Sequence, residues 1–331
     1  MTFLTISIIS IVLNLTLFLN HKILAKINNI FDIPDNKRKI HEKPIPLIGG
    51  LIIYINLLTF TILNLFFSIE TLNIFASIIQ SVSFIIIISL FFFLGRIDDK
   101  KDISSFSKFI AMAIFIVASI ILDKDLLITN VVFSFIDQTF HLKKFSFFFT
   151  ILCFLLFINA FNMLDGINAQ AATYALIIFI IFILKGIYLP LLIFISFSLF
   201  IYVFFNLKNL MFLGDSGSLI LGFLISYICI KSYNHEYIIN TDEIFFLMCI
   251  PGYELLRLFV KRILIGKNPF SADTHHLHHY LIKKFSFANT FIIIQIMIFL
   301  PILSFLIFRN FYISLCLSLV SYFLVLFFLR K

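Results

Sequence analysis

An acidic pair follows one of the apolar runs of this chain and could bind a cation or move a proton. Asp98 and Asp99 come directly after the apolar run 74–95, where a helix long enough to cross a bilayer would leave the hydrocarbon. Adjacent carboxylates repel one another unless a cation or a proton lies between them. Such a pair can hold a hard cation such as Mg²⁺ or act as a base, and it can also simply end a helix in water. Lys108 follows nearby and could pair with a phosphate oxygen.

Two further motifs bring hydrogen-bonding side chains to the ends of apolar runs. Segment 159–168 carries Asn162, Asp165 and Asn168, and such a cluster is costly in lipid unless it lines a wet cavity or bonds between helices. Segment 212–218, FLGDSGS, combines glycines and serines at the start of another run. This composition favours a tight backbone at a helix N-terminus, where N–H groups bind anions. Asp215 is then either the N-cap of that helix or a metal ligand.

The last two motifs are basic or rich in histidine. A basic run in segment 36–50 is followed by Gly49 and Gly50. It is either a topology signal that contacts anionic lipid, or a phosphate site to which the glycines allow close backbone approach. Segment 275–279 holds four histidines in five residues, which is too dense for core packing. Zinc binding is the alternative, but no cysteine is near, so these histidines are interpreted as phosphate or sugar contacts.

The elements that must position these motifs are membrane helices. The chain is 61% hydrophobic and 13% charged, with a mean hydropathy of +1.10, which excludes an ordinary soluble domain. Its apolar runs are continuous, whereas a barrel would alternate. The four cysteines lie inside these runs and are interpreted as small hydrophobic residues. The fold class is therefore all-α and polytopic, with one domain over 1–331 and about 10–11 transmembrane helices. The candidate spans are 3–20 (a retained helix, not a signal peptide), 47–67, 74–95, 109–122, 145–161, 170–184, 188–205, 211–230, 244–262, 288–308 and 311–329.

The distribution of basic residues between the loops predicts the orientation. One side of the predicted membrane collects 19 of the 25 Lys and Arg residues, and the other collects 6. The positive-inside rule places the N-terminus outside and the C-terminus in the cytoplasm. All five motifs then fall on the cytoplasmic side, where acids at the membrane edge indicate a functional site. The active-site loops expected there are 21–46, 96–108, 162–169, 206–215 and 263–287.

These motifs together resemble the polyprenyl-phosphate N-acetylhexosamine-1-phosphate transferases, membrane enzymes that begin lipid-linked glycan synthesis. The resemblance extends from Arg38 to His279, with five motifs in family order. They are KIHEKPIPLIGG (39–50), GRIDD (95–99), NAFNMLDG (159–166), FLGDSGS (212–218) and PFSADTHHLHH (269–279).

The resemblance implies a reaction and a location for it. A sugar-1-phosphate of the N-acetylhexosamine class would move from a UDP-sugar to undecaprenyl phosphate, releasing UMP. This would be the first membrane step of a cell-surface glycan such as lipopolysaccharide or a cell-wall polymer. The protein would be a multi-pass protein of the bacterial inner membrane with its active site facing the cytoplasm. Its partners would be the UDP-N-acetylhexosamine, undecaprenyl phosphate and membrane lipid, with no nucleic acid.

The resemblance also implies roles for individual residues. The cofactor would be Mg²⁺, with Mn²⁺ as a substitute, and the metal ligands would be Asn162 and Asp215. Asp98 or Asp99 would be the catalytic base or would position the acceptor phosphate. Residues implied in substrate binding are Lys39, His41, Lys108, Asp165, Asn168, His276, His278 and His279.

The sequence departs from the family pattern at two positions. Many members read Asp-Gly-x-Asp-Gly where this chain reads Asp165-Gly166-Ile167-Asn168-Ala169, so an amide replaces a carboxylate. This change weakens any role of position 168 as a base. Glu254 stands where Asp is common, and it is expected to pair with Arg257 on one helix face.

Three alternatives remain. The peptidoglycan branch of the family transfers a phospho-MurNAc-pentapeptide, but the segment HLHH at 276–279 favours the N-acetylhexosamine branch. A multi-span transporter would place its acids near the membrane midplane rather than at one face. An inactive relative acting as a scaffold is the third. The sequence leaves open the sugar, the glycan and whether the protein forms a homodimer.

Overall fold

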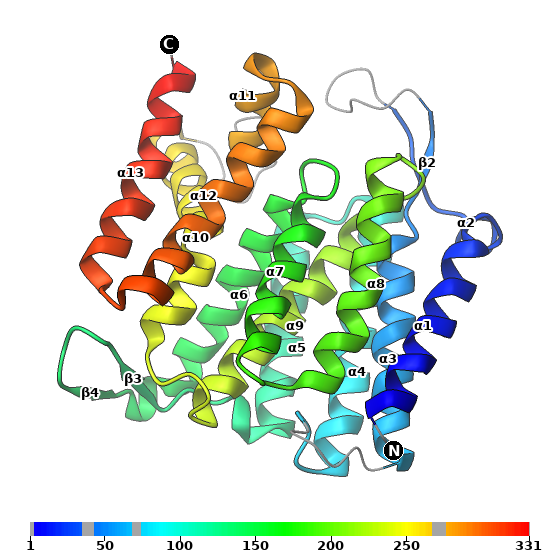
Figure 1. The fold of residues 1–331 in the computed structure, drawn as a ribbon, viewed down its shortest axis with the longest axis horizontal. Coiled ribbons are helices and arrows are strands. Elements are labelled where there is room, and N and C mark those ends of the chain that lie inside the picture. The colour runs from blue at the N-terminus through cyan, green and yellow to red at the C-terminus, as the bar shows by residue number, and fades with distance from the viewer. Residues whose placement is uncertain (1–2, 35–42, 68–73, 267–275, 331) are drawn as a thin grey trace.

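The chain forms a bundle of long helices, and all eleven predicted spans coincide with helices. The computed structural model describes residues 3–34, 43–67, 74–266 and 276–330. Figure 1 shows the two termini at opposite ends of the bundle. The helices at predicted spans are α1 (Phe3–Leu19), α3 (Gly49–Phe67), α4 (Ile78–Lys101), α5 (Ser105–Leu122), α6 (Ser146–Leu164), α7 (Gln170–Leu184), α8 (Leu189–Leu207), α9 (Gly214–Asn234), α10 (Thr241–Leu264), α12 (Phe287–Phe308) and α13 (Phe311–Arg330).

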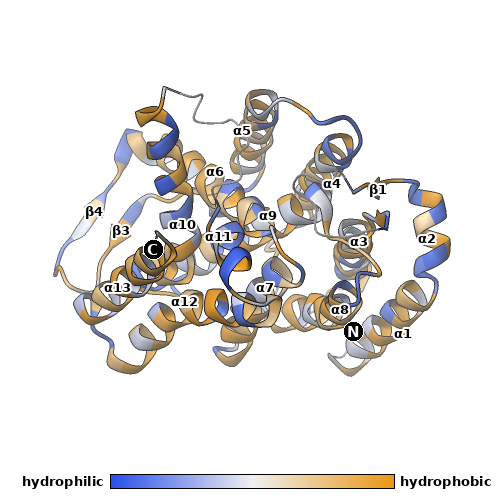
Figure 2. Ribbon diagram, turned by 90° about the horizontal axis from the view of Figure 1, so that it is seen from above, coloured by the Kyte–Doolittle hydropathy of each residue, from blue (hydrophilic) through white to orange (hydrophobic). Residues whose placement is uncertain are grey.

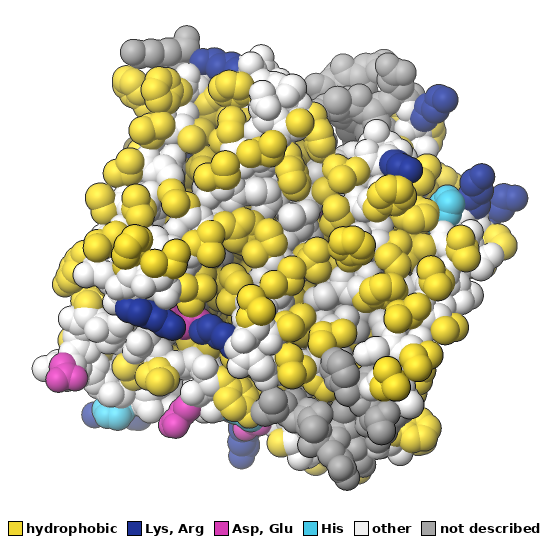
Figure 3. Space-filling view, viewed as in Figure 1, with side chains coloured by type: hydrophobic (Ala, Val, Ile, Leu, Met, Phe, Trp, Pro, Cys, Tyr) yellow, Lys and Arg dark blue, Asp and Glu magenta, His cyan; other side chains and the backbone are white. Residues whose placement is uncertain are grey.

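Length and hydropathy confirm the all-α membrane class. Within the described ranges, eight helices are long and apolar enough to cross a membrane. Helix α1 and the short, basic α2 (His21–Asn28) would form a ninth membrane span if they are counted as one helix, with a bend of 68° between them. Helix α7 is apolar but has only 15 residues, and α10 carries charges at both ends. Figure 3 shows apolar side chains covering the middle of the bundle, as contact with lipid requires.

Several expected active-site loops are shorter than predicted because the helices extend into them. Helix α4 continues through both acids to Lys101, and α5 begins at Ser105 rather than near 109. Ser104 starts α5 as its N-cap, with its hydroxyl accepting a hydrogen bond from the backbone of Ser107 at 3.2 Å. Asp98, Asp99 and Lys108 therefore lie on helices rather than on a loop, which fixes their directions.

Helix α9 is the central element of the bundle. It packs against α3, α4 and α6 (Figure 1), and 94% of its apolar stretch is buried inside the protein. Glycines allow this close approach: a Cβ on Gly95 of α4 or on Gly50 of α3 would collide with the backbone of α9 at Ser216 or Gly217. The expected role of Gly50 in approaching a phosphate is thus corrected, because its neighbour is the α9 backbone.

Short strands and one short helix cover the ends of the bundle. Strand β1 (Phe31–Asp32) pairs antiparallel with β2 (Ile45–Pro46), and β3 (Asn130–Val132) with β4 (Thr139–His141). A bridge between Leu47 and Phe212 brings the first polar loop beside the N-terminus of α9. Helix α11 (Leu277–Lys284) lies near the axis of the bundle when the molecule is seen from above (Figure 2). Two 3-10 turns, η1 (Lys124–Leu126) and η2 (Lys143–Phe145), complete the described elements.

Candidate active site

Ends of four helices meet around one lysine. Lys108, at the start of α5, donates hydrogen bonds from its ammonium to Asp98 Oδ2 at 2.6 Å and Asp215 Oδ1 at 2.8 Å. Asn162, in the last turn of α6, donates to the same Asp215 oxygen at 2.5 Å and to Ser218 Oγ at 2.7 Å. The bond between Lys108 and Asp215 joins residues 107 positions apart in the chain, so distant segments form one polar cluster.

The two adjacent acids have different partners because neighbouring residues on a helix point about 100° apart. Asp98 faces α5, and its other oxygen accepts a hydrogen bond at 2.8 Å from the backbone of Ile103, which lies just before that helix. Asp99 faces α9 and accepts hydrogen bonds from the backbone N–H groups of Asp215 at 2.7 Å and Ser216 at 3.2 Å. A carboxylate in that position satisfies free N–H groups and complements the helix dipole. The acids are therefore separate groups rather than one shared cation site.

The position of Asp99 also explains the GD motif. Gly214 has φ +72°, and a Cβ there would lie 2.7 Å from Asp99 Oδ2, so a side chain would be both strained and crowded. The alternative that Asp215 is the N-cap of α9 is wrong, because Leu213 holds that position and Asp215 lies in the first turn. Its carboxylate is instead directed to Lys108 and Asn162.

A cavity of about 580 Å³ opens beside this cluster. Six residues of the predicted site line it, namely Asp99, Asn162, Asp165, Asn168, Asp215 and His279. Asp98 and Lys108 are not in its wall, but Lys108 contacts Asp215, which is. Lys39 and His41, predicted to bind substrate, lie outside the described residues.

Asp165 and Asn168 form the turn between α6 and α7. Burial, with the negative charges of Asp215 and Asp99, raises the pKa of Asp165 to about 8. Asn168 donates from its amide to Asn206 O at 3.1 Å and to Asn209 Oδ1 at 2.6 Å. These bonds hold the turn against the end of α8. An amide can donate both, whereas the carboxylate common in the family could not.

The three predicted histidines that the structure describes occupy different environments. His279 lines the cavity, and His276 is the N-cap residue of α11. His278 is 9% exposed, and its ring lies directly over Gly166, where a Cβ would collide with it. Burial and the neighbouring imidazoles of His279 and His276 lower the pKa of His278 to about 3. It is neutral at physiological pH and suits packing or hydrogen bonding better than charge neutralisation.

Sequence reasoning missed several polar residues of the cavity wall, among them Ser218 and Asn206. Ser218, the last residue of the motif FLGDSGS, accepts a hydrogen bond from Asn162. Asn206 is 4% exposed, and its amide binds the backbone of Ala169 at 2.5 Å and of Met211 at 2.8 Å. A signal was present, because Asn206 immediately follows the apolar run 188–205, as Asn162 follows another.

The donor atoms of the cluster suit a hard divalent cation. Asp215 and Asn162 supply carboxylate and amide oxygens, which Mg²⁺ prefers. No group of three or more His, Cys, Asp or Glu side chains arranged for a metal occurs in the described part of the chain. Mg²⁺ commonly uses one or two carboxylates and completes its shell with water and substrate phosphates. The residues present therefore fit it.

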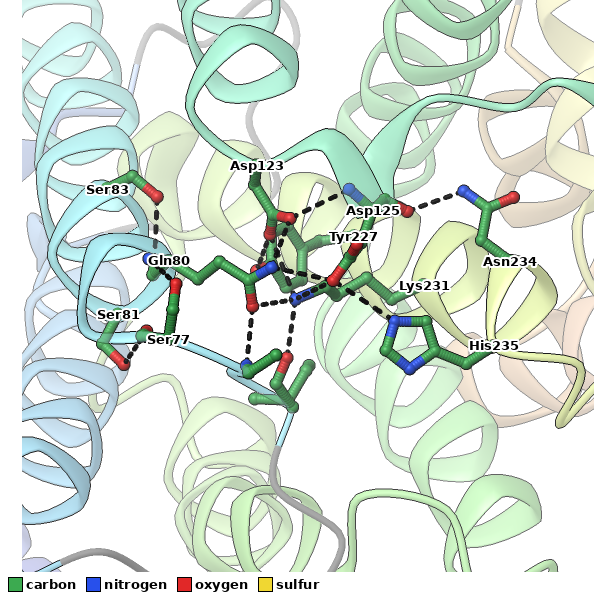
Figure 4. A network of polar contacts seen from close by, with 12 residues as sticks. Ser77, Gln80, Ser81, Ser83, Asp123, Asp125, Tyr227, Lys231, Asn234 and His235 are labelled. Carbon is green, nitrogen blue, oxygen red and sulfur yellow. Dashed lines mark hydrogen bonds and ion pairs between the residues drawn. The ribbon is translucent and has the colours of Figure 1, made fainter.

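A second buried polar cluster lies near the other ends of α4 and α9 (Figure 4). Lys231 is fully buried, donates to Gln80 Oε1 at 2.9 Å and pairs with Asp123 Oδ2 at 3.1 Å. Tyr227 donates to that same oxygen at 2.6 Å. Burial raises the pKa of Asp125, but the hydrogen bond from Gln80 and the charges of Lys231 and His235 outweigh it and lower that pKa overall. These groups satisfy one another, as a structural anchor requires.

The fold and the site define an all-helical, multi-pass membrane protein with a polar cavity at one end of the bundle. Residues 81–233 match the family model described as Glycosyl transferase family 4. The match confirms the resemblance predicted from the motifs, that to the polyprenyl-phosphate N-acetylhexosamine-1-phosphate transferases.

Curated relatives extend the similarity beyond the matched segment. The chain is 28% identical over 314 residues to the undecaprenyl-phosphate alpha-N-acetylglucosaminyl 1-phosphate transferase of Escherichia coli (strain K12), covering 89% of this chain and 82% of the relative. It is 26% identical over 293 residues to the protein of that name from Salmonella typhi, covering 85% and 76%. It is 27% identical over 273 residues to the one from Thermotoga maritima, covering 82% and 79%.

Proposed function

We propose that this protein is a phosphoglycosyl transferase that moves an N-acetylhexosamine-1-phosphate from a UDP-sugar to undecaprenyl phosphate. The Lys108 cluster, where Asp98, Asp215 and Asn162 converge beside a cavity at one end of the membrane bundle, is the observation that carries this proposal. The names of the relatives support the acceptor and the sugar nucleotide. We further propose that the cavity faces the cytoplasm of the bacterial inner membrane, as the basic loops indicate.

The bond changes place clear demands on the site. An oxygen of the acceptor phosphate attacks the β-phosphorus of the donor, and the bond from that phosphorus to the bridging oxygen breaks. UMP leaves with the bridging oxygen, and the product is a polyprenyl-diphospho-sugar. Phosphoryl transfer of this kind needs mainly positioning and charge neutralisation.

The acids are better suited to positioning than to proton abstraction. A phosphate monoester has a second pKa of about 6, so the acceptor is already largely ionised at neutral pH. Asp98 holds the Lys108 ammonium against Asp215, and Asp99 holds the N-terminus of α9. Asp215 and Asn162 would hold Mg²⁺, which when bound would neutralise charge on the pyrophosphate. Asp165 and His279 would lie on the nucleotide-sugar side of the cavity.

The test is conversion of radiolabelled UDP-N-acetylglucosamine by membranes that contain the protein. We expect a lipid-extractable product that needs undecaprenyl phosphate, with UMP released in equal amount and with activity lost on EDTA treatment and restored by Mg²⁺. A panel of UDP-N-acetylhexosamines identifies the sugar. No lipid product from any of these donors, with the protein folded, would reject the proposal.

Asp215→Ala is the first variant to test, because it removes a partner of Lys108 and the best candidate metal ligand. We expect turnover to fall by about a hundred- to a thousandfold, with the protein still folded. Asp137→Ala, an exposed acid near β4, is the matched control and should keep normal turnover. Wild-type rates in folded Asp215→Ala protein would refute the assignment.

A further inference from the structure

Glu254 of α10 lies outside the cavity wall, yet its carboxylate accepts hydrogen bonds from its own helix and from two others, α11 and α13. Its Oε1 atom accepts hydrogen bonds from Arg257 Nη2 at 2.7 Å and from the backbone N–H of Leu277 in α11 at 2.8 Å. Its Oε2 atom accepts from Arg257 Nε at 3.0 Å and from the Tyr322 hydroxyl of α13 at 2.6 Å. The predicted pair with Arg257 is confirmed, but it is only half of the arrangement.

Helix α11 needs such an external partner. It has eight residues, and a helix that short is marginal on its own. Its N-cap residue, His276, makes no side-chain capping bond. The first N–H groups of a helix require acceptors, and a carboxylate there also complements the helix dipole. Glu254 supplies this acceptor to the first helical residue of α11. Asp99 does the same for the second and third residues of α9.

The N-terminus of α11 is also the part that reaches the candidate site. His278, the residue after Leu277, covers Gly166 beside Asp165, and His279 lines the cavity. A displacement of the α11 N-terminus would therefore move both the cavity wall and the turn after α6.

We propose that Glu254 is a positioning residue that caps α11 from a neighbouring helix and so holds its histidines against the nucleotide-sugar side of the site. Arg257 and Tyr322 fix the carboxylate in the direction of Leu277. The effect on turnover rests on the proposed function, whereas the capping contact does not.

The chain offers a matched set of variants. Glu254→Ala removes the acceptor, while Glu254→Gln retains an oxygen that can accept from Leu277 and loses the charge. Glu243→Gln is the control, because Glu243 lies at the opposite end of the same helix and has its own ion pair, with Lys185. General damage to α10 would affect this control as well.

Hydrogen–deuterium exchange tests the contact without any assay of activity. In folded Glu254→Ala protein we expect the amides of 277–281 to exchange at least about tenfold faster, with α4 and α9 unchanged and Glu254→Gln intermediate. Unchanged exchange at 277–281 in Glu254→Ala would overturn the proposal. This measurement tests whether Glu254 caps α11 even if the protein proves not to be a transferase.

Kinetics test the positioning role. A tenfold loss of affinity corresponds to one hydrogen bond to a charged group, so we expect the KM for the UDP-sugar to rise about tenfold in Glu254→Ala. We expect kcat to change by less than about threefold, partial rescue in Glu254→Gln, and normal values in Glu243→Gln. Equal losses in Glu254→Ala and Glu243→Gln, or a fall in kcat alone, would contradict a positioning role.

Discussion

At the level of single residues, the acids of the site divide their roles according to the direction in which each one points. Asp98 and Asp99 are neighbours in sequence, but one binds the Lys108 ammonium and the other binds the backbone of α9. Asp215 receives both Lys108 and Asn162, which makes it the centre of the cluster. Asp165 stands apart, because it has acidic neighbours and no cation at hydrogen-bond distance among the described residues.

The isolation of Asp165 predicts a dependence of stability on pH. Its pKa is about 8 in the fold, against about 4 in an unfolded chain, so the folded state holds its proton more tightly. This contribution is fully present below about pH 4 and is lost as the pH rises to about 8. Asp165→Asn cannot ionise, so its apparent melting temperature without metal should exceed that of wild type by several degrees at pH 8, and the gap should narrow toward pH 5. A gap that does not vary with pH would contradict this account.

Ala169 offers a second prediction at this scale. It has φ +63°, a left-handed conformation that costs a residue with a Cβ about 1–2 kcal/mol. Ala169→Gly should therefore stabilise the protein by roughly 0.5–1 kcal/mol, after allowance for the greater freedom of glycine when unfolded. The melting temperature in detergent measures this, with Ala171→Gly inside α7 as a control that should destabilise. Loss of stability in Ala169→Gly would show that the conformation is not strained.

At the level of elements, helix α9 connects the two polar clusters. Its first turn carries Asp215, and its last turns carry Lys231, about 24 Å away along the helix axis. Between them the helix packs closely on α3 and α4 through glycine contacts. The position of Asp215 therefore depends on how the far end of the same helix is anchored.

Removal of the Lys231 ammonium tests that anchor. Lys231→Met leaves Asp123, which is 2% exposed, without its cation, and loss of one partner of a buried pair costs about 3–5 kcal/mol. We expect the melting temperature to fall by roughly 10 °C, while the exposed Lys144→Met changes it little. Adding Asp123→Asn to Lys231→Met should restore part of the loss. Unchanged stability in Lys231→Met would show that the pair is not an anchor.

At the level of the whole molecule, polar chemistry is separated along the axis of the bundle. The proposed active site lies at the end that also carries α11 and the C-terminus, while the N-terminus lies at the other end (Figure 1). The basic loops predict that the site end is cytoplasmic. An enzyme with one lipid substrate and one soluble substrate requires this placement at the membrane edge.

Cysteine labelling in intact cells measures this orientation. In a protein without its four native cysteines, a cysteine at Lys144 should react with a membrane-impermeant maleimide from outside, and one at Lys283 should react only after lysis. Both positions are exposed. The reverse pattern would place the site on the outer face and would exclude a cytoplasmic nucleotide sugar as the donor.

The membrane class, the helices at the eleven predicted spans and the five motifs could be predicted from the sequence. These follow from local hydropathy and from which residues interrupt it, so no long-range contact is needed to find them. It also placed Asn162, Asp165, Asn168 and Asp215 in one site through the family resemblance, and all four line the cavity.

The partner of each side chain, in contrast, follows from the packing of the helices. Asp98 and Asp99 have different partners because their side chains point in different directions from α4, toward different neighbouring helices. The contact of Glu254 with Leu277 and that of Lys231 with Asp123 likewise join residues 23 and 108 positions apart in the chain. Hydropathy does not predict which residues pair in this way, because the packing of the helices determines the pairs. Several buried partners could neutralise or bind the same charged group.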